Sequence, residues 1–191
     1  MAELGTRSAA TEDTTAADAV ELLREAEREF GNAPDVDAVS RSRELYLAAV
    51  RCDASMVEAF FGALRATAWL IEHDDDRERR KELALEGVQI GQWCARLHPE
   101  EVECTYRLAL AVGQQARERS STAVDGLDVM VELLETVIEK APELDFAGGQ
   151  RVLALVLLRA PGWPTGPGDP EFGLEHAEAA VNAFPDYPPN Q

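Results

Sequence analysis

Several residue types are scarce in this chain of 191 residues, and cysteine is the first of them. There are three cysteines, Cys52, Cys94 and Cys104, and no two of them form a CxxC pair. An odd count without that spacing matches neither a disulfide framework nor a zinc site. We therefore expect the three side chains to be small buried hydrophobic groups, in a protein of a reducing compartment.

Long hydrophobic runs are also missing. No segment approaches the roughly 20 apolar residues that a membrane-spanning helix needs, and the first residues contain neither the apolar core of a signal peptide nor a lipidation cysteine. Residues 1–15 are small, polar and rich in Thr and Ala, which predicts a disordered segment before the folded domain. The sequence as written is expected in the cytoplasm, or in the periplasm if an export signal is missing from it.

Positive charge is scarce as well. Lys and Arg together number 18 and Asp and Glu number 36, so the net charge is −18. A surface of this sign repels phosphate backbones and anionic lipids, which argues against a partner made of nucleic acid and against direct membrane insertion. The acidity favours solubility in the first place, and it would also help to steer a basic partner.

Residues that form catalytic or metal sites do not gather in any pattern. The three histidines, His73, His98 and His176, fall in different parts of the chain at spacings that suggest no shared metal ion. No nucleophile elbow or Ser/His/Asp order is present, and the carboxylates lie mostly in solvated runs. We predict a protein without catalytic residues, metal or cofactor.

Helix-forming residues are abundant. Proline is sparse between residues 16 and 160, where Ala, Leu, Glu and Arg dominate. In residues 83–97 the apolar positions Leu83, Ile90, Cys94 and Leu97 follow a helical period, with charged residues on the opposite face. These patterns predict an all-α protein.

The ends of the helical runs recur at a fixed period. The anchor positions Asp53, Pro99, Pro142 and Pro185 are separated by 46, 43 and 43 residues, and each unit between them holds two helical runs. A period of this length is typical of stacked helix-turn-helix repeats. The expected pairs are 16–31 with 36–52, 56–73 with 77–98, 101–119 with 122–140, and 146–159 with 170–184.

These repeats resemble tetratricopeptide (TPR) repeats. The segments "SRELYLAAVRCD" and "LLETVIEKAPELD" match the second helix of such a repeat and its closing residue. Thr122 and Asp125 look like a capping box at the start of a helix. We predict one TPR-like solenoid domain of about four helix pairs over residues 16–191.

Six aromatic residues lie at helical positions. Core packing between the repeats explains most of them, and one or two of them could instead line a concave surface, where such arrays bind peptides or other ligands. They are Tyr46, Phe60, Phe61, Trp69, Trp93 and Tyr106.

The segment "APGWPTGPGDPE", residues 160–171, interrupts the last helix pair. Asp169 is placed as an N-cap and Pro170 as the first helical residue. Prolines and glycines on both sides of Trp163 predict an ordered loop rather than a flexible one. The ring of Trp163 either folds back to cap the end of the solenoid or contacts a ligand or partner.

This segment and the residues after it resemble the TRAP transporter T-component family, which comprises bacterial TPR-like proteins associated with tripartite ATP-independent periplasmic transporters. The matching positions begin with the Pro-Gly-Trp-Pro segment and end with a Pro-x-Tyr-x-x-Asn closure, and the likeness extends over about residues 40–191. They are Ala160, Pro161, Gly162, Trp163, Pro164, Gly168, Asp169, Pro185, Tyr187 and Asn190.

The resemblance implies a non-catalytic binding protein. Its partner would be the solute-binding protein of a TRAP-type transporter, with an organic acid or another small apolar anion as a possible ligand. The loop residues would contact that ligand or partner. The family is exported and usually continues into a further helix, so this chain would be a fragment or would present an apolar edge that favours homo-oligomers. The alternative is a cytoplasmic TPR adaptor that binds a protein segment in its concave face.

Overall fold

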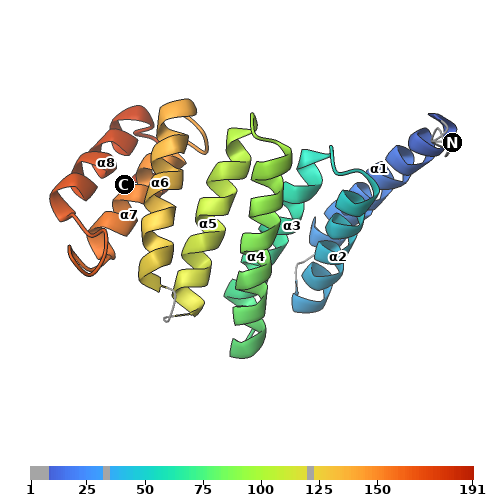
Figure 1. Ribbon diagram of the computed structural model, residues 1–191, viewed down its shortest axis with the longest axis horizontal. Coiled ribbons are helices and arrows are strands. Elements are labelled where there is room, and N and C mark those ends of the chain that lie inside the picture. Colours follow the sequence, from blue (N-terminus) through green and yellow to red (C-terminus); the bar gives the residue numbers. More distant parts are fainter. Residues whose placement is uncertain (1–8, 32–34, 120–122) are drawn as a thin grey trace, which may run out of the picture. The chain divides into compact units, whose positions relative to one another are not determined.

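The computed structural model describes residues 9–31, 35–119 and 123–191 (Figure 1). The all-helical, helix-turn-helix prediction is confirmed, because the named elements in these ranges are all helices. They are α1 (Ala9–Gly31), α2 (Val36–Cys52), α3 (Val57–His73), α4 (Arg77–Leu97), α5 (Val102–Glu118), α6 (Ala123–Lys140), α7 (Gly148–Arg159), α8 (Pro170–Ala183) and the 3-10 helix η2 (Pro188–Asn190).

The helices belong to two compact units. Unit 1 ends at His73 and contains α1 to α3, and unit 2 begins at Asp74 and contains α4 to α8. The single domain over residues 16–191 therefore stays a prediction. Within each unit, successive helices pack against one another, as repeated helical hairpins do.

Unit 1 is held by a small core between its three helices. Tyr46 of α2 and Phe60 of α3 are buried, and Gly62 of α3 lies directly under the Tyr46 ring, where a Cβ would overlap the ring carbons. Asp35 begins α2 as an N-cap, since its Oδ1 accepts a hydrogen bond of 2.7 Å from the backbone N of Ala38. Tyr46 and Phe60 are thus two helical aromatics that serve packing, as expected, whereas Trp93 of the same set is 50% exposed.

The core of unit 2 lies between α5, α6 and α7, which follow one another side by side (Figure 1). Each helix contributes one apolar stripe, as the helical period predicts. The buried members of this core are Tyr106, Ala109, Val112, Met130, Leu134, Val137, Leu153, Val156 and Leu157.

The cysteine prediction is right about the burial of Cys94 and Cys104, and it is wrong about their bonding and about Cys52. Cys94 near the end of α4 and Cys104 in α5 form a disulfide with a Cα–Cα distance of 5.4 Å, and Cys52 is exposed. The pair could not be recognised from spacing, because the turn between α4 and α5 brings together residues that lie ten positions apart. The bridge ties two consecutive helices of unit 2, and closing a loop of this size is worth about 3 kcal/mol in the chain-entropy model.

Two helix starts differ from expectation. Helix α1 begins at Ala9, so it covers residues 9–15 of the segment predicted to be disordered, in keeping with the helix propensity of its alanines. Residues 1–8 and the capping residue Thr122 lie outside the described part of the chain. Helix α7 begins at Gly148 instead of residue 146, because the backbone before it is left-handed.

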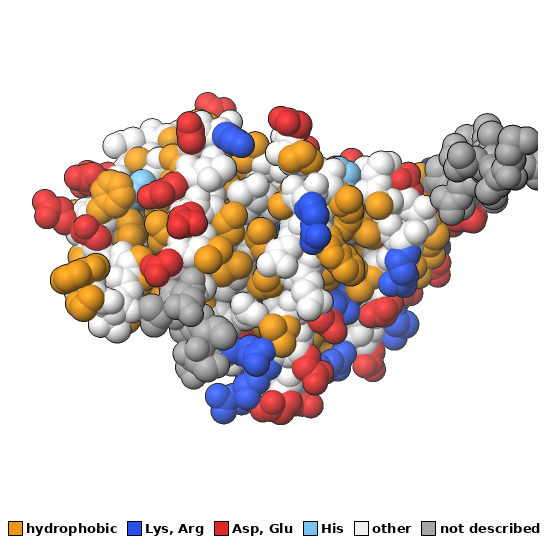
Figure 2. Space-filling view, viewed as in Figure 1, with side chains coloured by type: hydrophobic (Ala, Val, Ile, Leu, Met, Phe, Trp, Pro, Cys, Tyr) orange, Lys and Arg blue, Asp and Glu red, His pale blue; other side chains and the backbone are white. Residues whose placement is uncertain are grey.

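None of the helices in the described ranges is both long and apolar enough to cross a bilayer. On the face shown in Figure 2, acidic side chains are spread over the part formed by α6 to α8, with hydrophobic side chains between them.

Candidate functional site

An apolar groove of about 430 Å³ lies between α5 and α7, with α6 at its base. Its walls are aliphatic side chains, and Leu155 of α7 is 44% exposed there. The lining residues are Leu110, Gly113, Gln114, Arg117, Leu127, Met130, Val152, Leu155, Val156, Arg159, Ala160 and Pro161. Helices α5 and α7 are the first helices of two consecutive pairs. We call this the α5–α7 groove.

Two arginines, Arg117 and Arg159, line one end of this apolar surface. Arg117 is half exposed and has a carboxylate of Glu118 at 3.5 Å. Within the part of the chain that the structure describes, Arg159 has no ion-pair partner, although acidic residues outnumber basic ones two to one. The groove therefore combines apolar walls with positive charge, which suits an apolar ligand that carries a negative group.

The loop after α7 borders the groove through Ala160 and Pro161. It is closed by hydrogen bonds from the backbone N of Gly168 to the Pro161 carbonyl (2.8 Å) and from the N of Asp169 to the Leu157 carbonyl (3.0 Å). Asp169 is the N-cap of α8, accepting from the N of Phe172 at 3.1 Å, as predicted. The loop is ordered by its own backbone contacts.

Gly168 is needed in the loop because it has no side chain, not because of its backbone dihedral angles. No described glycine has a positive φ. Gly162 and Gly168 form an isolated parallel bridge, and a Cβ at Gly168 would overlap the carbonyl of Ala160. The missing side chain lets the two ends of the loop approach closely.

Trp163 stands at the tip of this loop with 90% of its surface exposed, next to Pro164 in a cis peptide bond. The ring therefore does not fold back to cap the solenoid. An exposed tryptophan on an ordered loop is available for contact with a partner, and tryptophan is a residue type on which binding energy concentrates.

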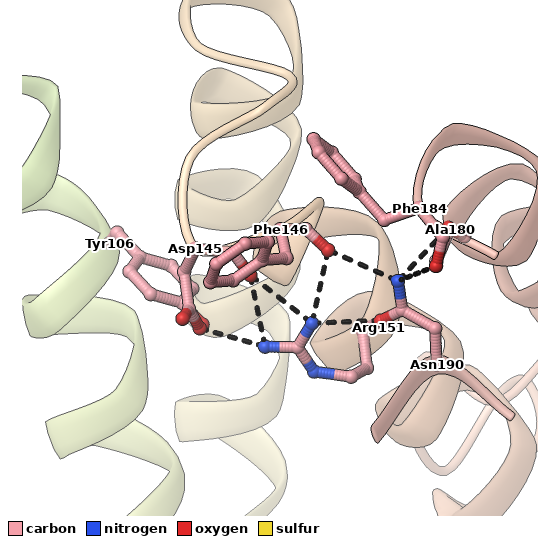
Figure 3. A network of polar contacts seen from close by, with 7 residues as sticks. All are labelled: Tyr106, Asp145, Phe146, Arg151, Ala180, Phe184 and Asn190. Carbon is pink, nitrogen blue, oxygen red and sulfur yellow. Dashed lines mark hydrogen bonds and ion pairs between the residues drawn. The ribbon is translucent and has the colours of Figure 1, made fainter. Parts of the chain in front are cut away.

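The predicted closure residues, Pro185, Tyr187 and Asn190, lie away from the loop, near the N-terminal end of α7, where Figure 3 shows Asn190. Asn190 is buried, and its Oδ1 accepts a hydrogen bond of 2.9 Å from Nη1 of Arg151. Its amide nitrogen donates to the carbonyls of Phe146, Ala180 and Phe184 at 3.2, 3.0 and 3.3 Å. Asn190 thus connects the end of the chain to the start of α7 and the end of α8.

Arg151 holds the turn before α7. Its Nη2 donates to Oδ2 of Asp145 at 2.7 Å, and its guanidinium also reaches the carbonyls of Asp145 and Phe146. Oδ2 of Asp145 accepts a further hydrogen bond of 2.7 Å from the hydroxyl of Tyr106. Burial, followed by this negative neighbour, raises the pKa of Tyr106.

These contacts hold an unfavourable backbone. Asp145, Phe146 and Ala147 have φ values of 50°, 54° and 62°, so three consecutive residues with side chains are left-handed. Each such residue costs roughly 1–2 kcal/mol. The sequence predicted a helix from residue 146 and gave no role to Asp145, Phe146 or Arg151. The adjacent Gly148 and Gly149 were the one available signal of close packing.

The predicted site residues thus form two groups. The loop residues adjoin the α5–α7 groove, and Pro185, Tyr187 and Asn190 lie around the turn before α7. Of the histidines, His176 lies against Gln150 and edge-on to Phe172, and burial lowers its pKa. Across the described ranges, no three His, Cys, Asp or Glu side chains are grouped so that they could hold a metal ion.

A scan against protein-family models gives no match, and neither does a search of curated proteins. Among solved structures, the chain is similar to YrrB, described as a TPR protein with an unusual peptide-binding site. The two share 16% identity with a TM-score of 0.42, and the alignment covers 95% of this chain and 93% of that one.

Proposed function

We propose that the chain is a non-catalytic binding scaffold that holds a partner protein in the α5–α7 groove. The observation that carries this proposal is the groove itself, with apolar walls, two arginines and an ordered loop at its border. Desolvated apolar contacts would supply affinity, and Arg159 would orient a carboxylate of the partner.

The partner that we propose is the solute-binding protein of a TRAP-type transporter, with this chain as its T-component. The Pro-Gly-Trp-Pro segment at residues 161–164 supports this role, since Pro161 lines the groove and the Trp163 ring, two residues further along, is 90% exposed. A cytoplasmic adaptor that binds a protein segment in the same groove is the alternative, and it needs the same lining residues.

The compartment separates these two roles. Disulfides persist in oxidising compartments and are rare in the cytosol. The Cys94–Cys104 bridge supports an extracytoplasmic location, such as the periplasm, and hence the transporter role. We therefore propose that the protein works after export.

The compartment is tested by counting thiols. Purified and denatured protein, prepared with its exposed thiol protected from air, should react with about one equivalent of a thiol reagent through Cys52, and with about three after reduction. Three equivalents before reduction, in protein isolated from its native compartment, would favour the cytoplasmic adaptor.

Binding is tested by titrating the protein with candidate TRAP solute-binding proteins and recording tryptophan fluorescence and calorimetric heats. Leu155→Gln makes the groove more polar at a position already 44% exposed, and Leu174→Gln on α8 is the matched control at 55%. Trp163→Phe has Trp93→Phe as its control, because Trp93 of α4 is 50% exposed and lies outside both the groove lining and the loop that borders it.

We expect Leu155→Gln and Trp163→Phe to weaken binding about tenfold or more, which is the loss of roughly 1.4 kcal/mol. The two controls should bind like the wild type, and all four variants should melt within a few degrees of it. If Leu155→Gln and Leu174→Gln bound the partner equally well, the α5–α7 groove would be excluded as the binding site. The absence of heat with any solute-binding protein would exclude that partner.

A further inference from the structure

A second hollow, of about 380 Å³, lies at the end of unit 2 and shares no residue with the α5–α7 groove. It is lined by three aromatic rings together with one carboxylate and two small apolar residues. These are Phe146, Phe184, Tyr187, Asp186, Ala183 and Pro185. We call it the aromatic hollow.

The three rings form an open corner. Phe146 stacks on Tyr187 with ring centroids 4.4 Å apart and an angle of 18° between the planes. Phe184 meets Phe146 edge-on, with centroids at 5.7 Å and an angle of 85°. Phe146 remains 51% exposed, so the corner keeps an accessible aromatic surface.

The backbone sets Phe146 in this place at a cost. Its φ of 54° lies in the left-handed region, which a phenylalanine rarely adopts and which Gly or Asn would occupy with less strain. Arg151 and Asn190 fix the turn through the Phe146 carbonyl (Figure 3). A half-exposed ring gains little burial free energy to offset this strain. Strained backbone of this kind is often found at ligand-binding and active sites.

The charge around the hollow favours a cation. Aromatic faces carry negative electrostatic potential, and Asp186 adds a carboxylate to the lining. Arg151 lies over the Tyr187 ring, with its guanidinium carbon 5.1 Å from the ring centroid, so this ring already has a cation. The arginine is 14% exposed and is paired with Asp145, which compensates its charge and leaves Phe146 and Phe184 as the rings for a further cation. The net charge of −18 draws basic proteins toward the surface as a whole.

We propose that the aromatic hollow binds a lysine or arginine side chain from a basic segment of a partner protein. The side chain's cationic end contacts the open faces of Phe146 and Phe184 and pairs with Asp186. Its aliphatic stem lies against Pro185 and Ala183. The aromatic hollow shares no residue with the α5–α7 groove, so a cation could bind there even if the groove bound no partner.

The test uses aromatic ¹³C-labelled protein and NMR titration with two peptides, acetyl-Gly-Lys-Gly-amide and the same peptide with norleucine in place of lysine. The lysine peptide should shift the ring resonances of Phe146, Phe184 and Tyr187, and the uncharged peptide should bind at least about threefold more weakly. Asp186→Asn, at an exposed position, should weaken the lysine peptide by a similar factor. Phe184→Leu should weaken it further, and Phe172→Leu on α8, 44% exposed outside the hollow, should leave it unchanged.

Equal binding of the norleucine peptide would overturn the proposal, because the hollow would then be a merely apolar surface. Wild-type affinity in both Asp186→Asn and Phe184→Leu would overturn it as well, as would a lysine peptide that shifts none of the three rings. A third titration with choline tests the source of the cation. If choline binds as tightly as the lysine peptide, the occupant is a small free cation and not a partner's side chain.

Discussion

Each unit contains a hydrogen-bonded cluster of one tyrosine, one arginine and one carboxylate, and the two clusters differ in their surroundings. In unit 1, Arg65 joins the hydroxyl of Tyr46 at 2.8 Å and a carboxylate of Glu27 at 2.8 Å. In unit 2, Asp145 joins Tyr106 and Arg151. Each tyrosine also lies against a glycine, Gly62 in unit 1 and Gly148 in unit 2, where a Cβ would overlap it.

The difference lies in what each arginine holds. Arg65 is 45% exposed, with Glu27 at 52%, and it connects side chains of three ordinary helices. Arg151 is 14% exposed and connects the left-handed turn, the buried Asn190 and Asp145. The same residue types therefore make a solvated cross-link in one unit and fix an unfavourable backbone in the other.

The largest expected effect separates the two arginines. Arg151→Met should lower the free energy of unfolding by about 3 kcal/mol, because it removes the donor of the buried Asn190 Oδ1 and releases the left-handed turn. Arg65→Met should cost no more than about 1 kcal/mol, since its ion pair with Glu27 is exposed and the guanidinium contact with the Phe30 ring adds little at such a site. Urea unfolding followed by circular dichroism measures both, and equal losses would show that Arg151 is an ordinary surface partner.

The glycine contact of unit 1 gives the next effect. Gly62→Ala should cost about 2 kcal/mol, because its methyl group would meet the fully buried ring of Tyr46. Gly31→Ala in α1 is the control, as nothing lies within 4 Å of its Cβ position, and it should change stability by no more than about 0.5 kcal/mol. Thermal melts of the two variants test this, and a neutral Gly62→Ala would mean that Tyr46 has room to move.

The smallest effect is a dependence on alkaline pH. Burial, then the hydrogen bond to Glu27, raises the pKa of Tyr46 from 10.0 to about 12. The unfolded chain loses this proton first, so the stability due to the neutral hydroxyl is full below pH 10 and is lost between pH 10 and about 12. Tyr46→Phe should therefore lose less unfolding free energy between pH 9 and 11 than the wild type. Parallel loss in both proteins would contradict the raised pKa.

Much of the fold could be predicted from the sequence. The helical period of residues such as Leu83 and Ile90 and the spacing of Pro99 and Pro142 depend on local propensity and on which face is apolar, and both are properties of neighbours in the chain. The N-cap role of Asp169 is of the same kind, because its partner lies three residues away. These predictions agree with the structure for that reason.

The candidate sites were less predictable. The loop was recognised from its composition. The groove depends on which side chains of α5, α6 and α7 face one another, and no local pattern contains that information. The Cys94–Cys104 pairing failed for the same reason, since it depends on a turn that places two helix ends together.

The sequence by itself thus determined the class of fold, the approximate helix boundaries, the acidic surface and the prominence of Trp163, because each follows from composition or short-range periodicity. Tertiary structure alone decided the disulfide, the groove and the left-handed turn at Asp145 to Ala147. That turn exists because Tyr106, Arg151 and Asn190 meet there across 84 residues of chain, and their contacts outweigh a local preference that would have continued α7.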